Sequence, residues 1–573
     1  MDLLLRDAWL IDGTGAPGRP ADVAVTGGRI SDVVPARSLA PAPGTEVIDL
    51  DGLALAPGFI DIHTHYDAQI LWDSDLTPSS WHGVTSVIMG NCGFGVAPTK
   101  PEHRDIIVRT LENVEGMSTD ALNAGIDWCF ETFPQYLDAL AARRKRLNVG
   151  AFLGHTPLRL FVLGGAERSA TAAEVSEMGR LLLEGLQAGA IGFSTSRQPA
   201  HSGAYGRPVP SRFAEVDEVD AMAAVLGMAA RGVLQVSIGP GLFVKEFSAL
   251  ATRYGIPVTW TALVTRTDKP GAALRTVERA GALPGEVYPQ IACRPIVMQV
   301  TMTDPTPLAA IDEWKEVLAL PREDRVSLYK DASWRDRARP ATLEAWAQRW
   351  PKVSVQETVA SPFAVGVPLD LLAAERGTTP FDLMIDIALA DGVAPGDPVT
   401  RFRVVLENDA DDEIGALLAD KRTILGLSDA GAHASQLCDA CFSTDLLGRW
   451  VRERRALSLE DAVWRLTGHP AAAFRLAGRG LVREGYFADL VAFDPATIGA
   501  SALERVYDQP GGADRLVARS TGVTHMWVNG VAARADGCDV PGVAAGQLLR
   551  GLRRLPPRGG LPRGYLFPTS HHF

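Results

Sequence analysis

Short apolar runs alternate with amphipathic segments through most of the chain. The intervening segments, such as residues 172–189 and 216–232, place apolar residues at the three- and four-residue spacing of helices. Eight apolar runs have the length of buried strands: GFIDIHTH (58–65), VTSVIMGNC (84–92), NVGAFLGH (148–155), AIGFSTS (190–196), GVLQVSI (232–238), IPVTWTAL (256–263), VSVQET (353–358) and TILGLSD (423–429). Repeated strand–helix units of this kind predict an α/β fold, a (β/α)₈ TIM barrel spanning residues 58–477.

The two ends of the chain have a different texture. Residues 1–57 and 478–545 contain short β-like runs separated by tight turns, and neither segment has much core of its own. We therefore expect them to form one small β-sandwich domain together. A stretch at about 268–350, rich in Pro, Trp and charge, predicts an insertion in the barrel, and residues 546–573 form a basic, Pro/Gly-rich tail.

Composition narrows the range of partners. The chain of 573 residues is 46% hydrophobic and 22% charged, with a formal net charge of −12. This balance argues against a nucleic-acid or acidic-membrane partner, which would favour clustered Lys and Arg. We see no signal peptide and no membrane span, and the six scattered cysteines favour free thiols in a reducing compartment, so we expect a cytoplasmic protein. A homo-oligomer is left open.

The ends of the strand-like runs carry the candidate chemistry. His63 and His65 close the first run one residue apart, so both imidazoles point to the same face of a strand. They are either a metal-binding pair or structural. Asp429 ends the eighth run, which neighbours the first in a closed barrel, and a carboxylate there can bind metal and accept a proton from water. Cys92 ends the second run, where it is either a soft ligand suited to zinc or an inert thiol.

Several motifs together resemble a known family. They are APGFIDIHTHYD, GVTSVIMGNCGFGVAPTK, GAIGFSTS, LGLSDAG and GYFADLVAFDP. These resemble the amidohydrolase superfamily and, within it, the N-acyl-D-amino-acid deacylases (D-aminoacylases), whose G-N-C-G cysteine replaces the carboxylated lysine of many other amidohydrolases. The resemblance implies that His63, His65 and Cys92 are metal ligands, that Asp429 is a general acid/base that also contacts the metal, and that the metal is zinc.

The sequence departs from that family on two strands. The deacylases carry a histidine ligand on the fifth and on the sixth strand. Here those strands contain no histidine, and the polar or aromatic positions are Gln235, Ser237, Thr259, Trp260 and Thr261. We therefore expect about one zinc ion per chain, held by His63, His65 and Asp429 with Cys92 as a fourth donor, or else no catalytic metal.

Four further residues are candidates for substrate contact: His155, Arg197, His201 and His433. His155 ends the third run in a motif similar to the deacylases' G-H-[ST]-x-L-R. Arg197 and His201 lie in the loop after the fourth run, and an arginine there could clamp a carboxylate through two parallel hydrogen bonds. Buried structural imidazoles and solvated loop residues are the alternatives.

These observations favour a metal-dependent hydrolase that cleaves a linear C–N amide in a small-molecule substrate of N-acyl-(D-)amino-acid type. Two alternatives stay open. One is an amidohydrolase of other amides or cyclic amides, because the altered fifth and sixth strands reshape the pocket. The other is a non-catalytic binding protein on the same scaffold.

Overall fold

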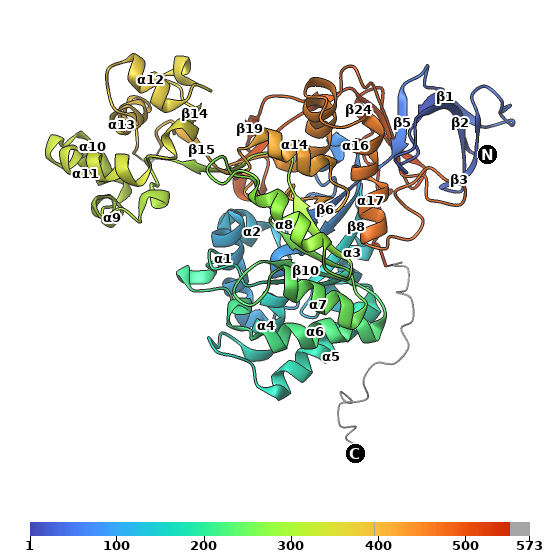
Figure 1. The fold of residues 1–573 in the computed structure, drawn as a ribbon, viewed down its shortest axis with the longest axis horizontal. Helices are drawn as coiled ribbons and strands as arrows, with labels where there is room; N and C mark the ends of the chain where they lie inside the picture. The colour runs from blue at the N-terminus through green and yellow to red at the C-terminus, as the bar shows by residue number, and fades with distance from the viewer. Residues whose placement is uncertain (395, 551–573) are drawn as a thin grey trace. The chain divides into compact units, whose positions relative to one another are not determined.

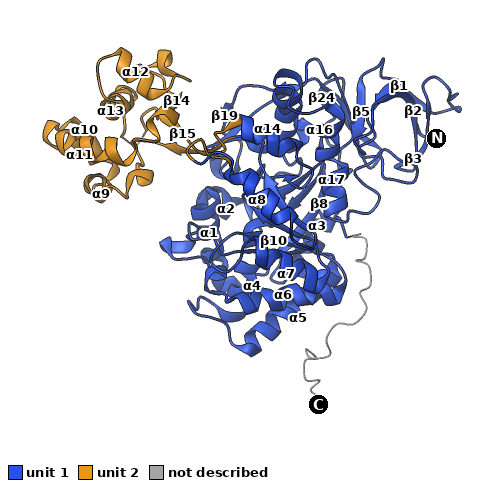
Figure 2. Ribbon diagram, in the orientation of Figure 1, with its two compact units in different colours: residues 1–264, 269–294, 412–573 blue, residues 265–268, 295–411 orange. Residues whose placement is uncertain are grey.

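The chain folds into two compact units in the computed structural model, which describes residues 1–394 and 396–550. The larger unit contains residues 1–264, residues 269–294 and the chain from residue 412, and the smaller unit contains residues 265–268 and 295–411 (Figure 2). The sequence predicts this insertion at about 268–350, whereas the main segment of the smaller unit spans 295–411.

Eight parallel strands form the central sheet of the larger unit (Figure 1). They are β6 (Phe59–Thr64), β7 (Val84–Met89), β8 (Asn148–Gly154), β9 (Gly192–Ser196), β10 (Val233–Ser237), β11 (Val258–Thr261), β12 (Val287–Ile291) and β16 (Ile424–Leu425). Pairing follows chain order from β6 to β12 and then β16. A parallel bridge between Thr64 and Ala430 brings the two ends of the sheet together. This is the curled parallel sheet of a TIM barrel, as the sequence predicts.

Helices follow most of these strands. They include α1 (Arg104–Glu115), α2 (Thr119–Gly125), α3 (Phe133–Ala142), α4 (His155–Leu163), α5 (Ala172–Ala188), α6 (Val216–Ala229), α7 (Val244–Tyr254), α8 (Ala272–Gly281), α14 (Asp411–Ala419), α16 (Leu459–Leu466) and α17 (Gly468–Ala473). The start of α5 shows why the sequence forms a helix there. The Thr171 hydroxyl accepts from the Glu174 N–H while the Glu174 carboxylate accepts from the Thr171 N–H, which satisfies two amides that the first helical turn leaves unpaired.

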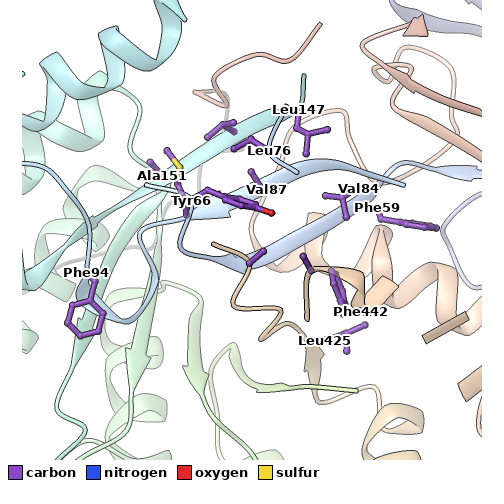
Figure 3. Packing of buried hydrophobic residues seen from close by; sticks show 14 of the residues in the cluster. Phe59, Tyr66, Leu76, Val84, Val87, Phe94, Leu147, Ala151, Leu425 and Phe442 are labelled. Atoms are coloured by element: carbon purple, nitrogen blue, oxygen red, sulfur yellow. The ribbon is translucent and has the colours of Figure 1, made fainter. Parts of the chain in front are cut away.

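The main hydrophobic core of the larger unit is one large cluster, separate from a smaller cluster that includes Ile62. Every residue of β6 and β7 is buried, as expected for parallel strands covered on both faces. Phe59, Tyr66, Val84 and Val87 belong to this core, and Figure 3 shows them around the first two strands. No helix in the described ranges combines the length and the apolar character that crossing a membrane requires.

The seventh barrel strand differs from the prediction. The run at 353–358 forms β14 (Val353–Glu357), which pairs antiparallel with β15 (Arg401–Glu407) in the smaller unit. The seventh strand is instead β12, which pairs with β11 and β16. Its short sequence VYPQI has a proline at its centre, whereas VSVQE shows the apolar–polar alternation that is typical of strands.

Strands from both chain ends share one mixed sheet. Its nine strands are β1 (Leu3–Leu10), β2 (Arg19–Thr26), β3 (Arg29–Pro35), β4 (Glu46–Asp49), β5 (Ala54–Pro57), β17 (Leu490–Phe493), β22 (Val523–Val528), β23 (Val531–Ala535) and β24 (Cys538–Asp539). β5 pairs with β17, which joins the two ends. Because this sheet belongs to the same compact unit as the barrel, a separate β-sandwich domain stays a prediction. Most of the basic tail lies outside the described residues.

The smaller unit has its own core. A three-stranded sheet of β13 (Ile296–Val300), β14 and β15 accompanies α9 (Asp312–Ala319), α10 (Arg325–Lys330), α11 (Ala332–Ala345), α12 (Leu369–Glu375) and α13 (Pro380–Asp391). Trp314 and Trp334 pack edge to face with ring centroids 5.4 Å apart, and Tyr329 and Phe381 surround them. These buried aromatic rings explain how a segment of this size forms a compact unit.

Candidate metal centre

Three predicted ligands converge at the carboxyl ends of β6 and β7. The ligand atoms of His63, His65 and Cys92 all lie within 4.8 Å of one another. Cys92 Sγ lies 3.4 Å from His63 Nε2, and the two imidazole rings meet edge to face at 5.3 Å. Both histidines are buried. The two-residue period of β6 therefore places both rings on one side, as predicted, and β7 brings the thiol to them.

The backbone around Cys92 is shaped for close packing. Cys92 has a φ of 56°, in the left-handed region that only a few side chains adopt readily. Gly93 follows with a φ of 77°, and a Cβ there would lie 2.9 Å from Thr195 Cα. Only glycine lets the loop approach β9 this closely. Local backbone strain of this kind is concentrated at functional sites.

Asp429 reaches the same point from the end of β16, which meets β6 where the sheet closes. Its Oδ1 lies 3.2 Å from His63 Nε2 and 3.7 Å from His65 Nε2. The Thr64–Ala430 bridge and the hydrogen bond from the His65 N–H to the Ala430 carbonyl (2.7 Å) fix this approach. The Asp429 side chain is 36% exposed, so the cluster opens to solvent on its side.

Each imidazole has a second partner behind it. His63 Nδ1 lies 2.7 Å from Gln290 Oε1 on β12, and His65 Nδ1 lies 3.4 Å from Glu115 Oε1 at the end of α1. Both Nε2 atoms are thereby directed toward Cys92 and Asp429. Metal-ligating histidines commonly donate their other N–H to a carboxylate or carbonyl oxygen in this way.

The electrostatics favour ionised donors. Desolvation opposes ionisation of Cys92, but the neighbouring His63 and His65 lower the pKa of its thiol to about 6. Desolvation likewise acts against Asp429, yet hydrogen bonding from His65 and the charges of both imidazoles hold the pKa of that carboxyl well below its usual range. Burial raises the pKa of Glu115 to about 8, against the opposing charge of His65. At neutral pH the cluster thus offers a thiolate and a carboxylate.

The residues expected to contact substrate occupy two different environments. His155 is fully buried, with Nδ1 2.8 Å from Thr195 Oγ1 and Nε2 2.7 Å from Glu218 Oε1. Glu218 also pairs with the buried Arg159. Both ring nitrogens of His155 therefore have partners inside the protein.

His201, His433 and Arg197 are more open. His201 Nδ1 lies 2.7 Å from Ser196 Oγ, and burial lowers the pKa of its imidazole to about 4. Burial also lowers the pKa of His433, whose backbone N–H donates to the Glu115 carbonyl at 2.5 Å. The partly exposed Arg197 follows β9 directly, where its N–H donates to Ser237 O at 3.2 Å. The two histidines are thus neutral at pH 7.

Comparisons with known proteins agree with this geometry. Residues 46–533 match the family model described as "Amidohydrolase family". The chain belongs to the amidohydrolase family. It is 30% identical to the D-aminoacylase of Alcaligenes xylosoxydans xylosoxydans, over 92% of this chain and 93% of that protein. It is 32% identical to the N-acyl-D-aspartate deacylase of the same organism, over 92% and 91%.

Two solved structures share the fold of this amidohydrolase over nearly its whole length. One is a D-aminoacylase described as having a binuclear metal centre, with a TM-score of 0.65, 26% identity and coverage of 96% of this chain and 99% of that one. The other is the N-acyl-D-glutamate deacylase from Bordetella bronchiseptica, complexed with zinc and a phosphonate inhibitor, with a TM-score of 0.63, 26% identity and coverage of 96% and 100%. The protein is therefore a metal-dependent hydrolase of carbon–nitrogen bonds other than peptide bonds.

The donor types at this centre of the amidohydrolase fit zinc. Two imidazole nitrogens, a thiolate and a carboxylate are ligands that zinc takes in tetrahedral sites, and His63, His65 and Cys92 already lie close enough to share one ion. On β10 and β11 the polar side chains make hydrogen bonds instead. Gln235 Oε1 accepts from the Cys92 N–H at 2.7 Å, and Thr259 Oγ1 accepts from Gln290 at 3.0 Å.

Sequence reasoning did not find Glu115 or Gln290. Glu115 lies on a helix after the second strand, in a stretch whose pattern is only amphipathic, so its contact with His65 carries no local signal. Gln290 lies on the strand that the apolar pattern misplaced. A polar residue in the middle of a short buried strand was the available clue.

Proposed function

We propose that this amidohydrolase cleaves the amide of an N-acyl amino acid, with D configuration at the amino-acid centre, using one zinc ion per chain. The observation that carries the proposal is the convergence of His63, His65, Cys92 and Asp429 at one open barrel mouth. The similarity to D-aminoacylase and to two N-acyl-D-amino-acid deacylases supports the substrate class.

In this proposal different residues of the chain bind the metal and transfer the proton. His63, His65 and Cys92 hold the ion, with Asp429 at its solvent side. Zinc bound there would supply a Lewis acid for the acyl carbonyl and would lower the pKa of water. Asp429 is ionised at neutral pH, so it can accept a proton from the attacking water at Oδ1 and return it to the leaving amine.

Substrate recognition is assigned to the residues around this centre. Arg197 is the candidate clamp for the amino acid's carboxylate, since a guanidinium binds a carboxylate bidentately. His201 and His433, both neutral, can donate or accept hydrogen bonds to the acyl amide. We assign His155 to support of the mouth, because both its nitrogens are already paired.

A second candidate function is hydrolysis of other amides, including cyclic amides. It is favoured by the uncharged lining at Gln235, Ser237 and Thr261, whose side chains form a hydrogen-bond network beside Cys92.

Cellular location is also part of the proposal. All six cysteines are free thiols, which supports a reducing, cytoplasmic compartment.

Metal analysis and a substrate panel test the proposal together. Purified protein should hold about one zinc per chain, and replacing His63 and His65 together by alanine should abolish binding, since two of the donors are removed. Asp536→Asn is a matched control. Asp536 is an exposed residue that pairs with His525, so its replacement should leave the metal content unchanged. Full occupancy in the double variant would show that the ligands are wrong.

The panel should contain N-acyl-D-amino acids, their L-enantiomers and cyclic amides, assayed with added zinc. Preferential release of the D-amino acid is the expected result. Turnover of cyclic amides alone would favour the second function. A zinc-loaded protein that hydrolyses nothing on the panel would favour a binding protein on this scaffold.

A further inference from the structure

We infer that Gln290 and Gln235 are positioning residues that orient two metal ligands through hydrogen-bond chains of fixed direction. Gln290 would fix which nitrogen of His63 carries its proton, and Gln235 would hold the backbone of Cys92. The inference rests on the metal site of the proposed function. Both glutamines are fully buried.

The direction of the first chain follows from one backbone carbonyl. The Thr259 hydroxyl donates its only proton to the Tyr288 carbonyl, which can only accept, at 3.2 Å. Thr259 Oγ1 must therefore accept from Gln290 Nε2, 3.0 Å away. The amide of Gln290 is thereby oriented with Oε1 toward the imidazole of His63.

This orientation of the Gln290 amide determines which ring nitrogen of His63 carries the proton. Gln290 Oε1 has no proton to give, so His63 Nδ1, at 2.7 Å, must be the donor. In the neutral imidazole the lone pair then lies on Nε2, the nitrogen that faces Cys92 Sγ and Asp429 Oδ1. With the amide reversed, its NH₂ would donate to Nδ1, the proton would move to Nε2, and that nitrogen could no longer bind a metal.

The second chain begins at a donor. The Cys92 backbone N–H can only donate, and it points at Gln235 Oε1 from 2.7 Å. Gln235 Nε2 then faces Thr261 Oγ1 at 3.5 Å, and this hydroxyl donates to Ser237 Oγ at 3.2 Å. Because Cys92 has a φ of 56°, this anchor helps hold an unfavourable backbone conformation in which Sγ faces His63.

Cobalt titration of the metal-free protein tests both assignments without substrate. Gln290→Met keeps the side-chain size and removes the acceptor, and we expect it to weaken Co²⁺ binding by about 10- to 100-fold, the usual cost of losing an outer partner. Gln290→Glu should stay within about threefold of wild type, because a carboxylate also accepts from Nδ1–H. Gln235→Met should reduce the thiolate-to-cobalt charge-transfer absorbance, since it releases Cys92.

A matched control separates these effects from general loss of a glutamine. Gln356→Met alters a glutamine of the smaller unit, whose amide pairs with Gln299, and it should change neither the affinity nor the spectrum. Thermal unfolding of each variant shows whether it is folded. If Gln290→Met does not fold, Thr259→Val tests the same hydrogen-bond chain one step further from the ligand, and a several-fold loss of Co²⁺ affinity is expected. If Gln235→Met does not fold, Thr261→Val does the same for the second chain, and a several-fold loss of charge-transfer absorbance is expected.

NMR spectra of protein with ¹⁵N-labelled histidine give a second readout that does not depend on metal. In the metal-free protein, at a pH where His63 is neutral, its proton should reside on Nδ1 in the wild type and redistribute toward Nε2 in Gln290→Met. A wild-type proton on Nε2, or Co²⁺ affinity of a folded Gln290→Met within about threefold of wild type, would overturn the assignment of Gln290. An unchanged charge-transfer band in a folded Gln235→Met would overturn that of Gln235.

These outcomes are distinguishable from failure of the proposed function. If no substrate is hydrolysed but the variants behave as described, the positioning roles stand and the activity is wrong. If the wild type binds no metal at all, the metal centre of the proposed function fails, and the tautomer of His63 still decides the role of Gln290.

Discussion

Replacing Asp429 by asparagine separates proton transfer from metal binding and from folding. The backbone at Asp429 has a φ of 47°, and asparagine is among the few residues that adopt this left-handed conformation readily. The side chain is 36% exposed and the two side chains are nearly the same size, so the variant adds neither strain nor a cavity. We therefore expect its melting temperature to stay close to that of the wild type. Asp429→Ala would lack this advantage.

The expected loss of activity follows from the chemistry at Oδ1. This atom lies 3.2 Å and 3.7 Å from the Nε2 atoms of His63 and His65, where a carboxylate can take a proton from water held at the same centre. An amide cannot accept that proton at neutral pH. Loss of a general base lowers turnover by about 10²- to 10⁴-fold, which corresponds to about 2.7 to 5.4 kcal/mol in the activation free energy.

The assay measures kcat on the best substrate of the panel, with the zinc content of each preparation determined in parallel. His63, His65 and Cys92 remain, so the variant should retain metal. Asp312→Asn is the matched control, because Asp312 is 88% exposed in the smaller unit and should leave kcat unchanged. A metal-loaded, folded Asp429→Asn that turns over within about threefold of wild type would refute the assignment of Asp429 as the general base.

The remaining predictions concern Cys92 and Glu218. In metal-free protein the alkylation rate of Cys92 should level off above a pH of about 6, well below the ordinary thiol value of 9.0, and added zinc should protect it. Cys92→Ser identifies the signal, and an ordinary thiol titration would contradict the prediction. Glu218→Gln should destabilise the fold by about 3–5 kcal/mol, because it leaves the buried Arg159 without its charge partner. Although burial opposes ionisation, His155 and Arg159 hold the pKa of Glu218 at about 2, below its ordinary 4.5. The ionised Glu218 therefore stabilises the fold above a pH of about 4.5, and this stabilisation is lost as the pH falls toward 2. Over that range the melting temperature of the wild type should fall more than that of Glu218→Gln. Equal falls in melting temperature would contradict the assignment.

Much of the barrel and the approximate position of the centre were predictable from the sequence, because both depend on short-range periodicity. An apolar run ending in a polar residue marks a strand end, and parallel strands bring their ends to one edge. That rule is enough to bring His63, His65, Cys92 and Asp429 together. It fails for the seventh strand, where VSVQE has the stronger pattern and VYPQI occupies the barrel position. Periodicity reports local burial, and it cannot tell which of two buried strands a barrel includes.

The sequence by itself determined the types of donor at the centre, the absence of histidine from β10 and β11, and the order of the strands that carry them. Only the tertiary structure decided which residues form hydrogen bonds or ion pairs with the ligands. His63 and Gln290 are 227 residues apart, and Cys92 and Gln235 are 143 apart, so no local pattern couples them. Glu115 reaches His65 from a helix end whose sequence is merely amphipathic. Hydrogen bonds require atoms within about 3 Å in a defined direction, and that precision comes only from the packing of the whole barrel.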